Sequence, residues 1–173
     1  GRHMEKKIMG RSVLISLMAI FMASCNLAGE PQALVVSRRG EDIVAAAADS
    51  GKVVFADSEP EKVLEWAMLN SPVTILQDGS YTIADMLDIP RPDIALIIGA
   101  DAELVQGKNP EPTTITEGHG TYRPLIYNDG HDNVKFINLG TLRAFGKQGG
   151  WSAGIHFDGR SGGECGIDGG LIF

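Results

Sequence analysis

The residues from Asn70 to Gln106 constrain the fold of this 173-residue chain more than any other stretch. Four short β-rich runs follow one another there: Val73–Leu76, Tyr81–Ile83, Ile94–Ile98 and Glu103–Val105. Turn-forming Gly, Asp and Pro residues separate the runs, and no interval has room for a crossover helix. The stretch therefore predicts the entry into a coiled sheet, a right-handed parallel β-helix, within an all-β fold.

The rest of the chain carries the same rhythm. Strands are expected at Ala33–Ser37, Lys52–Ala56, Leu125–Tyr127, Val134–Leu139, Thr141–Phe145, Gly154–Asp158 and Gly166–Phe173, with Val134 and Phe136 pointing inward. The run Ile43–Ala48 is ambiguous between strand and helix because alanine favours helices. Lys108–Pro124 is expected to be a loop. A β-sandwich has a similar strand rhythm, but the scarcity of two-residue hairpin turns favours the solenoid.

One helix is predicted, from Glu59 to Asn70. Ser58 is expected to cap it, and Pro60 suits its first turn. Apolar residues then recur at helical spacing, so Trp66 and Leu69 are expected on the buried stripe. Such a helix would cover the open apolar end that the first coil of a solenoid presents.

The N-terminal residues predict export. Residues 1–3 look like a cloning remnant, and residues 4–24 have the basic start and short apolar run of a signal peptide. The run Ser12–Ala23 is too short to span a membrane comfortably. It ends in Met22-Ala23-Ser24-Cys25, which resembles a bacterial lipobox, so Cys25 is the expected lipidation site. Plain secretion is the alternative. Residues 25–32 would then be a tether and residues 33–173 the β-helix domain.

Composition excludes some partners. The formal net charge is −7, and no basic face is visible that could neutralise nucleic-acid phosphates. Two cysteines are present, and because Cys25 is explained by lipidation, Cys165 is expected to be an unpaired buried thiol. No signature for a nucleotide, a structural metal or a Ser-His-Asp triad appears.

A family resemblance follows from these segments. The order VVF, acidic turn, short helix, VTILQDGSYTI and IALIIGADAEL, from Val53 to Val105, resembles the N-terminal part of pectin-lyase-like β-helix proteins. The resemblance implies a surface or secreted protein that acts on polysaccharide, first of all on uronate-containing glycans, by lyase or hydrolase chemistry. That superfamily also includes non-catalytic adhesins, so a carbohydrate-binding or structural surface protein is the alternative.

The segment Gly154–Arg160 is the main candidate for chemistry. Period-2 alternation puts Ile155 and Phe157 in the core. The expected outer-face residues are His156, Asp158 and Arg160, with Asp168 one coil further on beside Asp158. A lyase needs a base and a cation that neutralises the uronate carboxylate, and the two aspartates could begin a Ca²⁺ site. A hydrolase needs two carboxylates. The alternative is a solvated face, since Asp before Gly is turn chemistry.

Further polar residues could contact a glycan. Trp151 lies in a Gly-rich loop where it could stack on a sugar, and Tyr122 and Arg123 could overhang a groove. The cluster Asn128-Asp129-Gly130-His131-Asp132-Asn133 could bind a metal or sugar hydroxyls, or could simply be a turn. Asn138 is expected to play a structural role at a bend. The chain stops in an apolar strand, which predicts a truncated chain or an oligomer that covers this end.

Overall fold

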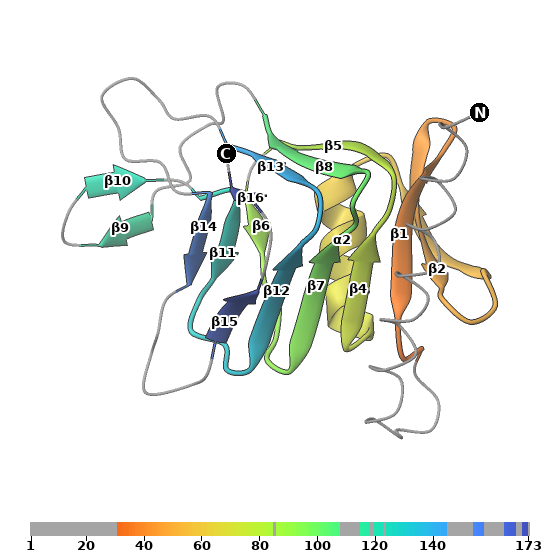
Figure 1. The fold of residues 1–173 in the computed structure, drawn as a ribbon, viewed down its shortest axis with the longest axis horizontal. Coiled ribbons are helices and arrows are strands. Elements are labelled where there is room, and N and C mark those ends of the chain that lie inside the picture. The colour runs from red at the N-terminus through yellow and green to blue at the C-terminus, as the bar shows by residue number, and fades with distance from the viewer. Residues whose placement is uncertain are drawn as a thin grey trace, which may run out of the picture.

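The computed structural model describes residues 31–84, 86–107, 115–117, 120–122, 124–144, 154–157, 165–168 and 171–172. Within them the chain is mostly β-structure with one helix, which confirms the all-β expectation (Figure 1). The elements are β1 (Leu34–Arg39), β2 (Asp42–Ala47), β3 (Val53–Asp57), α2 (Pro60–Asn70), β4 (Val73–Leu76), β5 (Gly79–Ile83), β6 (Leu87–Asp88), β7 (Ile94–Ile98), β8 (Ala102–Gln106), β9 (Ile115–Glu117), β10 (Gly120–Tyr122), β11 (Ile126–Asn128), β12 (Val134–Asn138), β13 (Thr141–Arg143), β14 (Ile155–Phe157), β15 (Cys165–Asp168) and β16 (Leu171–Ile172).

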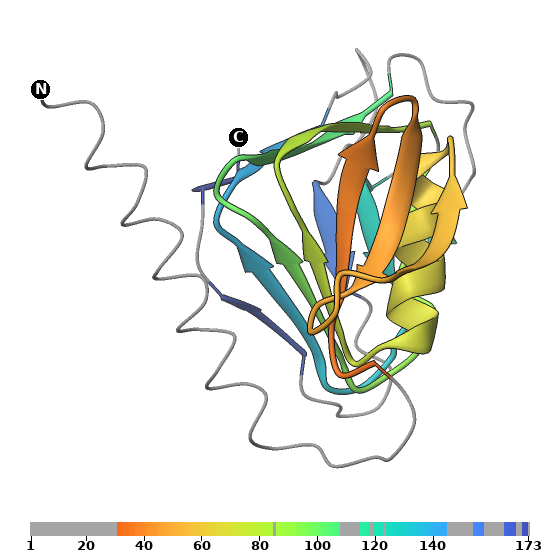
Figure 2. The ribbon, with the colours of Figure 1, turned by 90° about the vertical axis from the view of Figure 1, so that its right-hand side faces the viewer.

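Three antiparallel strands open the described chain. β1 and β2 pair from Leu34 opposite Ala47 to Arg39 opposite Asp42, which leaves a two-residue turn at Gly40 and Glu41. Gly40 has a φ of +67°, the positive value that such hairpin turns require. The alanine-rich run that was ambiguous in the sequence is strand β2, because pairing with β1 and β3 satisfies its backbone on both sides. Figure 2 shows these strands and α2 gathered at one end of the molecule.

Helix α2 forms where the sequence predicts it, but its start differs from the expectation. Ser58 does not cap it. Instead the Asp57 carboxylate accepts a hydrogen bond from the Glu59 backbone N–H at 3.0 Å, and this bond is the main reason why the pKa of Asp57 lies below its ordinary value. The N-cap residue is Glu59, and no side chain makes a capping hydrogen bond to the helix, so the predicted capping by Ser58 is wrong.

The buried face of α2 also differs in part. Its buried side chains are Val63, Leu64, Ala67 and Met68. The predicted burial of Leu69 is wrong, since its side chain is 55% exposed. Trp66 is half-buried at the edge of the core, where it stacks on Phe55 of β3 with ring centroids 4.8 Å apart. The buried stripe thus consists of two pairs of adjacent residues, Val63–Leu64 and Ala67–Met68, one helical turn apart. Leu69 lies beside this stripe on the flank of the helix.

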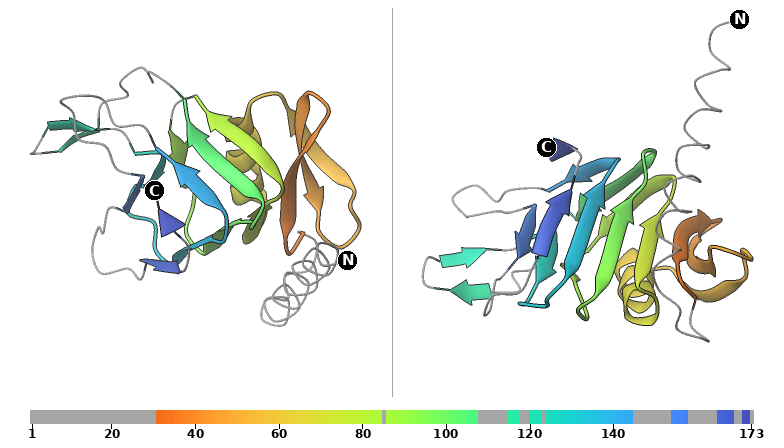
Figure 3. Two further views of the ribbon diagram at one scale, coloured as in Figure 1. Left: turned by 45° about the horizontal axis from the view of Figure 1, so that its top comes forward. Right: turned by 60° about the horizontal axis from the view of Figure 1, so that its bottom comes forward.

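After the helix, the chain passes through three sheets in rotation. The strands β4, β7, β12 and β15 belong to the seven-stranded sheet that also holds β1–β3. The strands β5, β8, β13 and β16 form a four-stranded sheet, and β6, β11 and β14 form a three-stranded sheet. All pairings within these three sets are parallel. After each strand the chain therefore passes through the other two sheets before it returns to pair with that strand (Figure 3). We call one such pass through the three sheets a circuit.

Backbone hydrogen bonds also join the corners between the sheets. At the corner that follows the seven-stranded sheet, the residue after each strand donates an N–H to a carbonyl of the neighbouring strand in that sheet. The bonds are Gln77 N to Val36 O at 2.9 Å, Gly99 N to Leu76 O at 2.8 Å and Leu139 N to Ile98 O at 2.9 Å. Successive circuits are thus hydrogen-bonded at this corner as well as along their strands.

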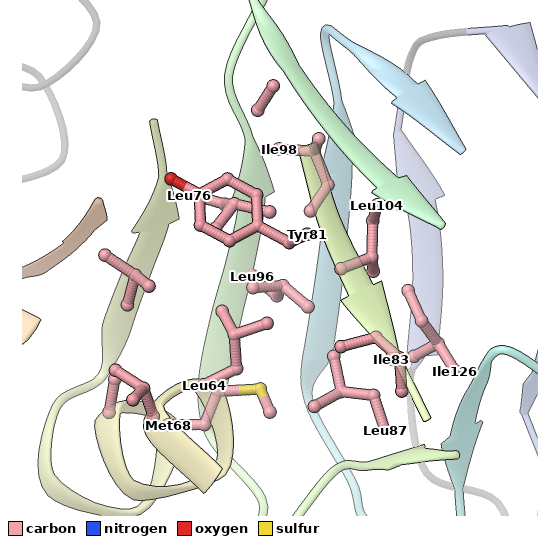
Figure 4. Close-up of a cluster of buried hydrophobic side chains, with 14 of the residues drawn as sticks. Leu64, Met68, Leu76, Tyr81, Ile83, Leu87, Leu96, Ile98, Leu104 and Ile126 are labelled. Atoms are coloured by element: carbon pink, nitrogen blue, oxygen red, sulfur yellow. The ribbon is translucent and has the colours of Figure 1, made fainter. Parts of the chain in front are cut away.

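The core lies between the three sheets and the helix. Figure 4 shows side chains from all of them converging, among them Leu64, Met68, Leu76, Tyr81, Leu96, Leu104 and Ile126. The inward orientation predicted for Val134 and Phe136 is confirmed, since each side chain is 1% exposed. Asn138 is also fully buried, and its Oδ1 accepts a hydrogen bond from Gly140 N at 3.1 Å, which fits its expected structural role.

Two short features were missed in the sequence. The segment Lys108–Pro124, expected to be loop, contains the antiparallel pair β9 and β10. Strand β6 has only two residues, too few for a periodicity signal. No helix among the described residues is long and apolar enough to span a membrane. The predicted signal peptide, its apolar run Ser12–Ala23 and Cys25 lie outside the described residues.

Candidate functional site

The outer face of the three-stranded sheet carries one polar residue from each strand. Tyr127 of β11 lies between Asp88 of β6 and His156 of β14, in direct parallel register with both. On either side of this row, Leu87 and Ile126 are fully buried and Ile155 packs against the core. Alternation along each strand therefore turns Asp88, Tyr127 and His156 away from the core. Figure 1 shows the three strands side by side.

Two of these residues form an aromatic pair. The rings of Tyr127 and His156 have centroids 5.6 Å apart and are tilted by 30°. The Tyr127 hydroxyl donates a hydrogen bond to Asp129 Oδ1 at 3.3 Å. Tyr127 and His156 are both half-buried, so the pair offers ring surface to a ligand while the neighbouring strands limit its movement.

Three acidic residues lie on or next to this face: Asp129, Asp88 and Glu65. Asp88 is exposed, and its backbone N–H points at Glu65 Oε1 of helix α2, 3.4 Å away. Asp129 is also exposed. The segments Met86–Pro90, Pro124–His131 and Gly154–Phe157, which build this face, contain no lysine or arginine. We call the five residues Glu65, Asp88, Tyr127, Asp129 and His156 the Tyr127 face.

The polar cluster from Asn128 to Asn133 is a turn. Asn128 is fully buried, its Nδ2 donates to His131 O at 3.0 Å and its Oδ1 accepts from His131 N at 3.1 Å. Asn133, with a φ of +53°, donates from Nδ2 to Asp93 Oδ1 at 2.8 Å. These amides hold the chain between β11 and β12, so the turn interpretation accounts for them. Asp129 also accepts the hydrogen bond from the Tyr127 hydroxyl.

The predicted site residues are only partly assembled. His156 lies on the Tyr127 face. Asp168 lies on β15, which belongs to the seven-stranded sheet, whereas His156 lies on β14 in the three-stranded sheet. The expectation that Asp168 follows one coil beyond the His156 segment on the same face is therefore wrong, because the chain turns onto the next sheet between β14 and β15. The strand that pairs with β14 from the preceding circuit is β11, which brings Tyr127 to His156 instead.

The remaining predicted residues are less well placed. Asp158, Arg160, Trp151 and Arg123 lie outside the described residues. Tyr122 lies on β10, opposite Ile115 of β9, and this hairpin projects near β11 and β14 in Figures 1 and 3. Cys165 lies on β15, opposite Val134. Within the described residues no group of three or more His, Cys, Asp or Glu side chains could hold a metal ion.

Sequence reasoning missed Asp88, Tyr127 and Asp129 as members of one site. A signal was nevertheless present, since Leu87-Asp88-Ile89, Ile126-Tyr127-Asn128 and Ile155-His156-Phe157 all begin with an apolar residue followed by a polar or aromatic one. Aligning the three triplets would have required the number of residues in each circuit to be known. That number is not constant, because the segment with β9 and β10 is inserted between β8 and β11.

The Tyr127 face combines groups suited to sugar recognition. Aromatic rings pack against the apolar faces of pyranose rings, and carboxylates accept hydrogen bonds from hydroxyl groups. An imidazole can donate or accept a proton near neutral pH. Comparisons of this chain with protein-family models, with curated proteins and with solved structures find no match.

Proposed function

We propose that this chain is a polysaccharide-binding protein of right-handed parallel β-helix architecture, with its glycan on the Tyr127 face. The architecture is supported by the rotation of the chain through three parallel sheets and by the stacked corners. The resemblance of Val53–Val105 to pectin-lyase-like proteins points the same way. Helix α2 and the β1–β3 meander would then close the first circuit of the coil, as the sequence predicts for a capping element.

The observation that carries the function is the row Asp88, Tyr127 and His156. Adjacent strands are about 4.8 Å apart, so the row extends over about 10 Å across the strands. In an extended polysaccharide, the length of one sugar unit is similar to the spacing between adjacent strands. Successive sugar units could therefore contact successive strands. A row of one polar or aromatic residue per strand is therefore suited to a chain-like ligand.

Cleavage of the bound glycan is the second candidate function, and His156 is the observation that favours it. Its imidazole lies at the end of the row and could act as a general acid or base in lyase or hydrolase chemistry. A lyase would also need a cation to neutralise the uronate carboxylate. Arg123 and Arg160, or Ca²⁺ bound near Asp158 and Asp168, are the expected sources, and the side chains of these four residues lie outside the description.

The proposed location of the protein is the outer membrane or the cell surface. The basic start, the apolar run and the lipobox-like Met22–Cys25 support export followed by acylation of Cys25. Residues 25–32 would tether the β-structure to the membrane. Globomycin treatment of expressing bacteria, or substitution Cys25→Ala, should leave the protein unprocessed or release it from the membrane fraction.

One experiment tests binding and cleavage together. The chain is mixed with a panel of neutral and uronate polysaccharides, and the thermal unfolding midpoint, the ultraviolet absorbance of unsaturated products and the reducing ends are recorded. Binding should raise the midpoint for at least one glycan. Substitution His156→Ala should weaken that shift and abolish any product, whereas Thr82→Ala, an exposed position on β5, should change neither. If no glycan shifts the midpoint or is cleaved, the proposed function is wrong.

A further inference from the structure

We propose that the outer face of the seven-stranded sheet rests on the lipid surface to which an acylated Cys25 anchors the chain. Six aliphatic side chains of β1, β4, β7 and β12 build this face, and we call them the Ile97 face: Val35, Val73, Ile75, Ala95, Ile97 and Ile137. The inference rests on the acylation of Cys25 in the proposed function. It adds a second binding surface to the Tyr127 face.

The register of the sheet places these side chains on its outer side. Four of them follow one another in parallel register across four adjacent strands: Val35, Ile75, Ile97 and Ile137. Leu96 and Ile98, which flank Ile97 on its strand, both belong to the core cluster. Because successive side chains of a strand point to opposite faces, Ile97 and its row point away from the core. Figure 1 shows β4, β7 and β12 side by side.

The burial of apolar residues indicates a second apolar layer on this side. Among the described residues, five apolar ones are buried without belonging to the core cluster: Ala33, Val44, Ala46, Ile75 and Ala95. All five occupy outward positions of this sheet or directly precede β1. Ile75 is 2% exposed, whereas its register partners Val35 and Ile97 are partly exposed. The layer therefore has an apolar outer surface of its own.

The outer face of the four-stranded sheet provides a contrast within the same chain. Its outward residues form two rows across β5, β8 and β13: Ser80, Glu103 and Thr141, and Thr82, Val105 and Arg143. Val105 is the single aliphatic residue in these two rows. A sheet face that meets water carries polar side chains at alternate positions. The aliphatic rows of the Ile97 face are instead typical of a surface that contacts an apolar partner.

The charges beside the Ile97 face fit a lipid surface. The outward positions of β1, β2, β4, β7 and β12, all of them described, contain one acidic residue, Asp42, and its register partner is Arg39. Lys135 is exposed in register with Ala95. The chain as a whole carries a net charge of −7. Since anionic lipids repel negative charge, a face without an excess of acidic residues suits a bilayer surface.

The position of the tether favours a membrane over a second copy of the chain. Residues 25–33 lead directly into β1, which lies beside β4 in this sheet, and fully extended they span at most about 30 Å. The anchor therefore holds the Ile97 face near the bilayer at a high effective concentration. Its two rows cover a strip about 14 Å long and about 7 Å wide. A stable protein interface buries about 800 Å² on each partner, which is far more than this strip offers.

The test places tryptophan reporters on the face of the full-length acylated protein. The protein is extracted from bacterial membranes and reconstituted into vesicles of phosphatidylethanolamine and phosphatidylglycerol. The reporters are Ile97→Trp and Ile137→Trp, which lie on neighbouring strands, so a folding defect in one variant leaves the other. The matched control is Val105→Trp on the outer face of the four-stranded sheet. Brominated lipids quench tryptophan from within the bilayer, and iodide quenches it from water.

We expect brominated lipids to quench the emission added by Ile97→Trp and Ile137→Trp at least about threefold more than that added by Val105→Trp, because an apolar face at a bilayer sinks about 5–10 Å into it. Iodide should show the opposite order. Equal quenching of all three reporters by brominated lipids overturns the inference. Protection of both face reporters from both quenchers also overturns it, because a second copy or residues 12–23 of an unprocessed chain would then cover the face.

Mass spectrometry of the same protein separates this inference from the proposed function. If Cys25 carries no acyl group, the proposed location fails and the inference fails with it. If Cys25 is acylated and the face reporters respond like Val105→Trp, the inference alone is wrong. Glycan binding by the Tyr127 face is measured independently of either result.

Discussion

The imidazole of His156 lies against the phenol ring of Tyr127, 5.6 Å from it between centroids, although 28 residues separate them in the chain. The contact arises because β14 pairs with β11 in parallel register and both residues point away from the core. Neither residue reaches the other through a local turn. The pair therefore exists only if the chain passes through the other two sheets between them, so it depends on the fold as a whole.

The Tyr127 ring should matter more for ligand binding than its hydroxyl group does. Tyr127→Phe keeps the ring beside His156 and loses only the 3.3 Å hydrogen bond to Asp129. Tyr127→Ala removes the ring. We expect Tyr127→Ala to weaken glycan binding about tenfold and Tyr127→Phe about two- to threefold. Isothermal titration with a glycan that binds the unmodified chain provides the measurement. Equal losses for the two variants would contradict a role for the ring.

Two leucines of helix α2 should respond very differently to truncation. Leu64 is completely buried, whereas Leu69 is 55% exposed. Leu64→Ala should lower the free energy of unfolding by about 3 kcal/mol, because it removes core contacts and leaves a cavity. Leu69→Ala should change it by less than about 0.5 kcal/mol. Urea unfolding followed by circular dichroism measures both. A large loss at Leu69 would mean that another surface covers this side of the helix.

Sequence reasoning located the strands better than it located the face of each residue. Val73–Leu76 and Ile94–Ile98 are strands with the predicted bounds, because alternating β-branched residues between turn residues are a local signal. Leu69 was misplaced because α2 buries adjacent pairs of residues, and the helix rotation that selects them is set by the sheets below it. The turn around Gly40 was predicted, but the antiparallel pairing of β1 with β2 across it was not.

The candidate site was predicted only at His156. Its partners depend on which strands pair, and β14 meets β11 rather than a strand that follows it. Asp168 is nearer to His156 in sequence than Tyr127 is, but lies on another sheet. Sequence separation is thus a poor guide to proximity here, because the chain leaves a sheet after each strand and returns one circuit later.

Two glycines should be required for different physical reasons. At Gly140, which follows β12, a Cβ would overlap the backbone carbonyl oxygens of Gly99 and Ala102, which belong to the preceding circuit. At Gly40 there is open space, but φ is +67°. Gly140→Ala should cost about 3 kcal/mol of unfolding free energy through overpacking, and Gly40→Ala about 1 kcal/mol through backbone strain.

Asparagine variants separate the two causes. Asparagine tolerates positive φ better than alanine does, so Gly40→Asn should be more stable than Gly40→Ala. At Gly140 the larger side chain should make Gly140→Asn no more stable than Gly140→Ala. Thermal unfolding midpoints of the four variants provide the comparison. If asparagine rescued Gly140, crowding between circuits would not be the reason for the glycine.

Tyr81 should make the fold sensitive to alkaline pH. Its side chain is completely buried, its hydroxyl donates to Asp78 O at 3.2 Å, and the Arg38 guanidinium lies 5.9 Å from the ring centroid. Burial raises the pKa of Tyr81 above its ordinary value of 10.0, and the nearby Arg38 charge opposes this only in part. Because the pKa is higher in the folded state, the resulting stabilisation is fully present below pH 10.0 and is lost as the pH rises through the folded-state pKa.

The variant Tyr81→Phe isolates this effect. At neutral pH it should be less stable than the unmodified chain by about 1 kcal/mol, because it lacks the hydrogen bond to Asp78 O. As the pH rises above 10.0 the difference should shrink, since phenylalanine has no proton to lose. Unfolding free energies measured in urea on both sides of that pH give the two slopes, and Tyr127→Phe at the half-buried tyrosine serves as the matched control. A constant difference across the range would show that the ionisation of Tyr81 is not linked to unfolding.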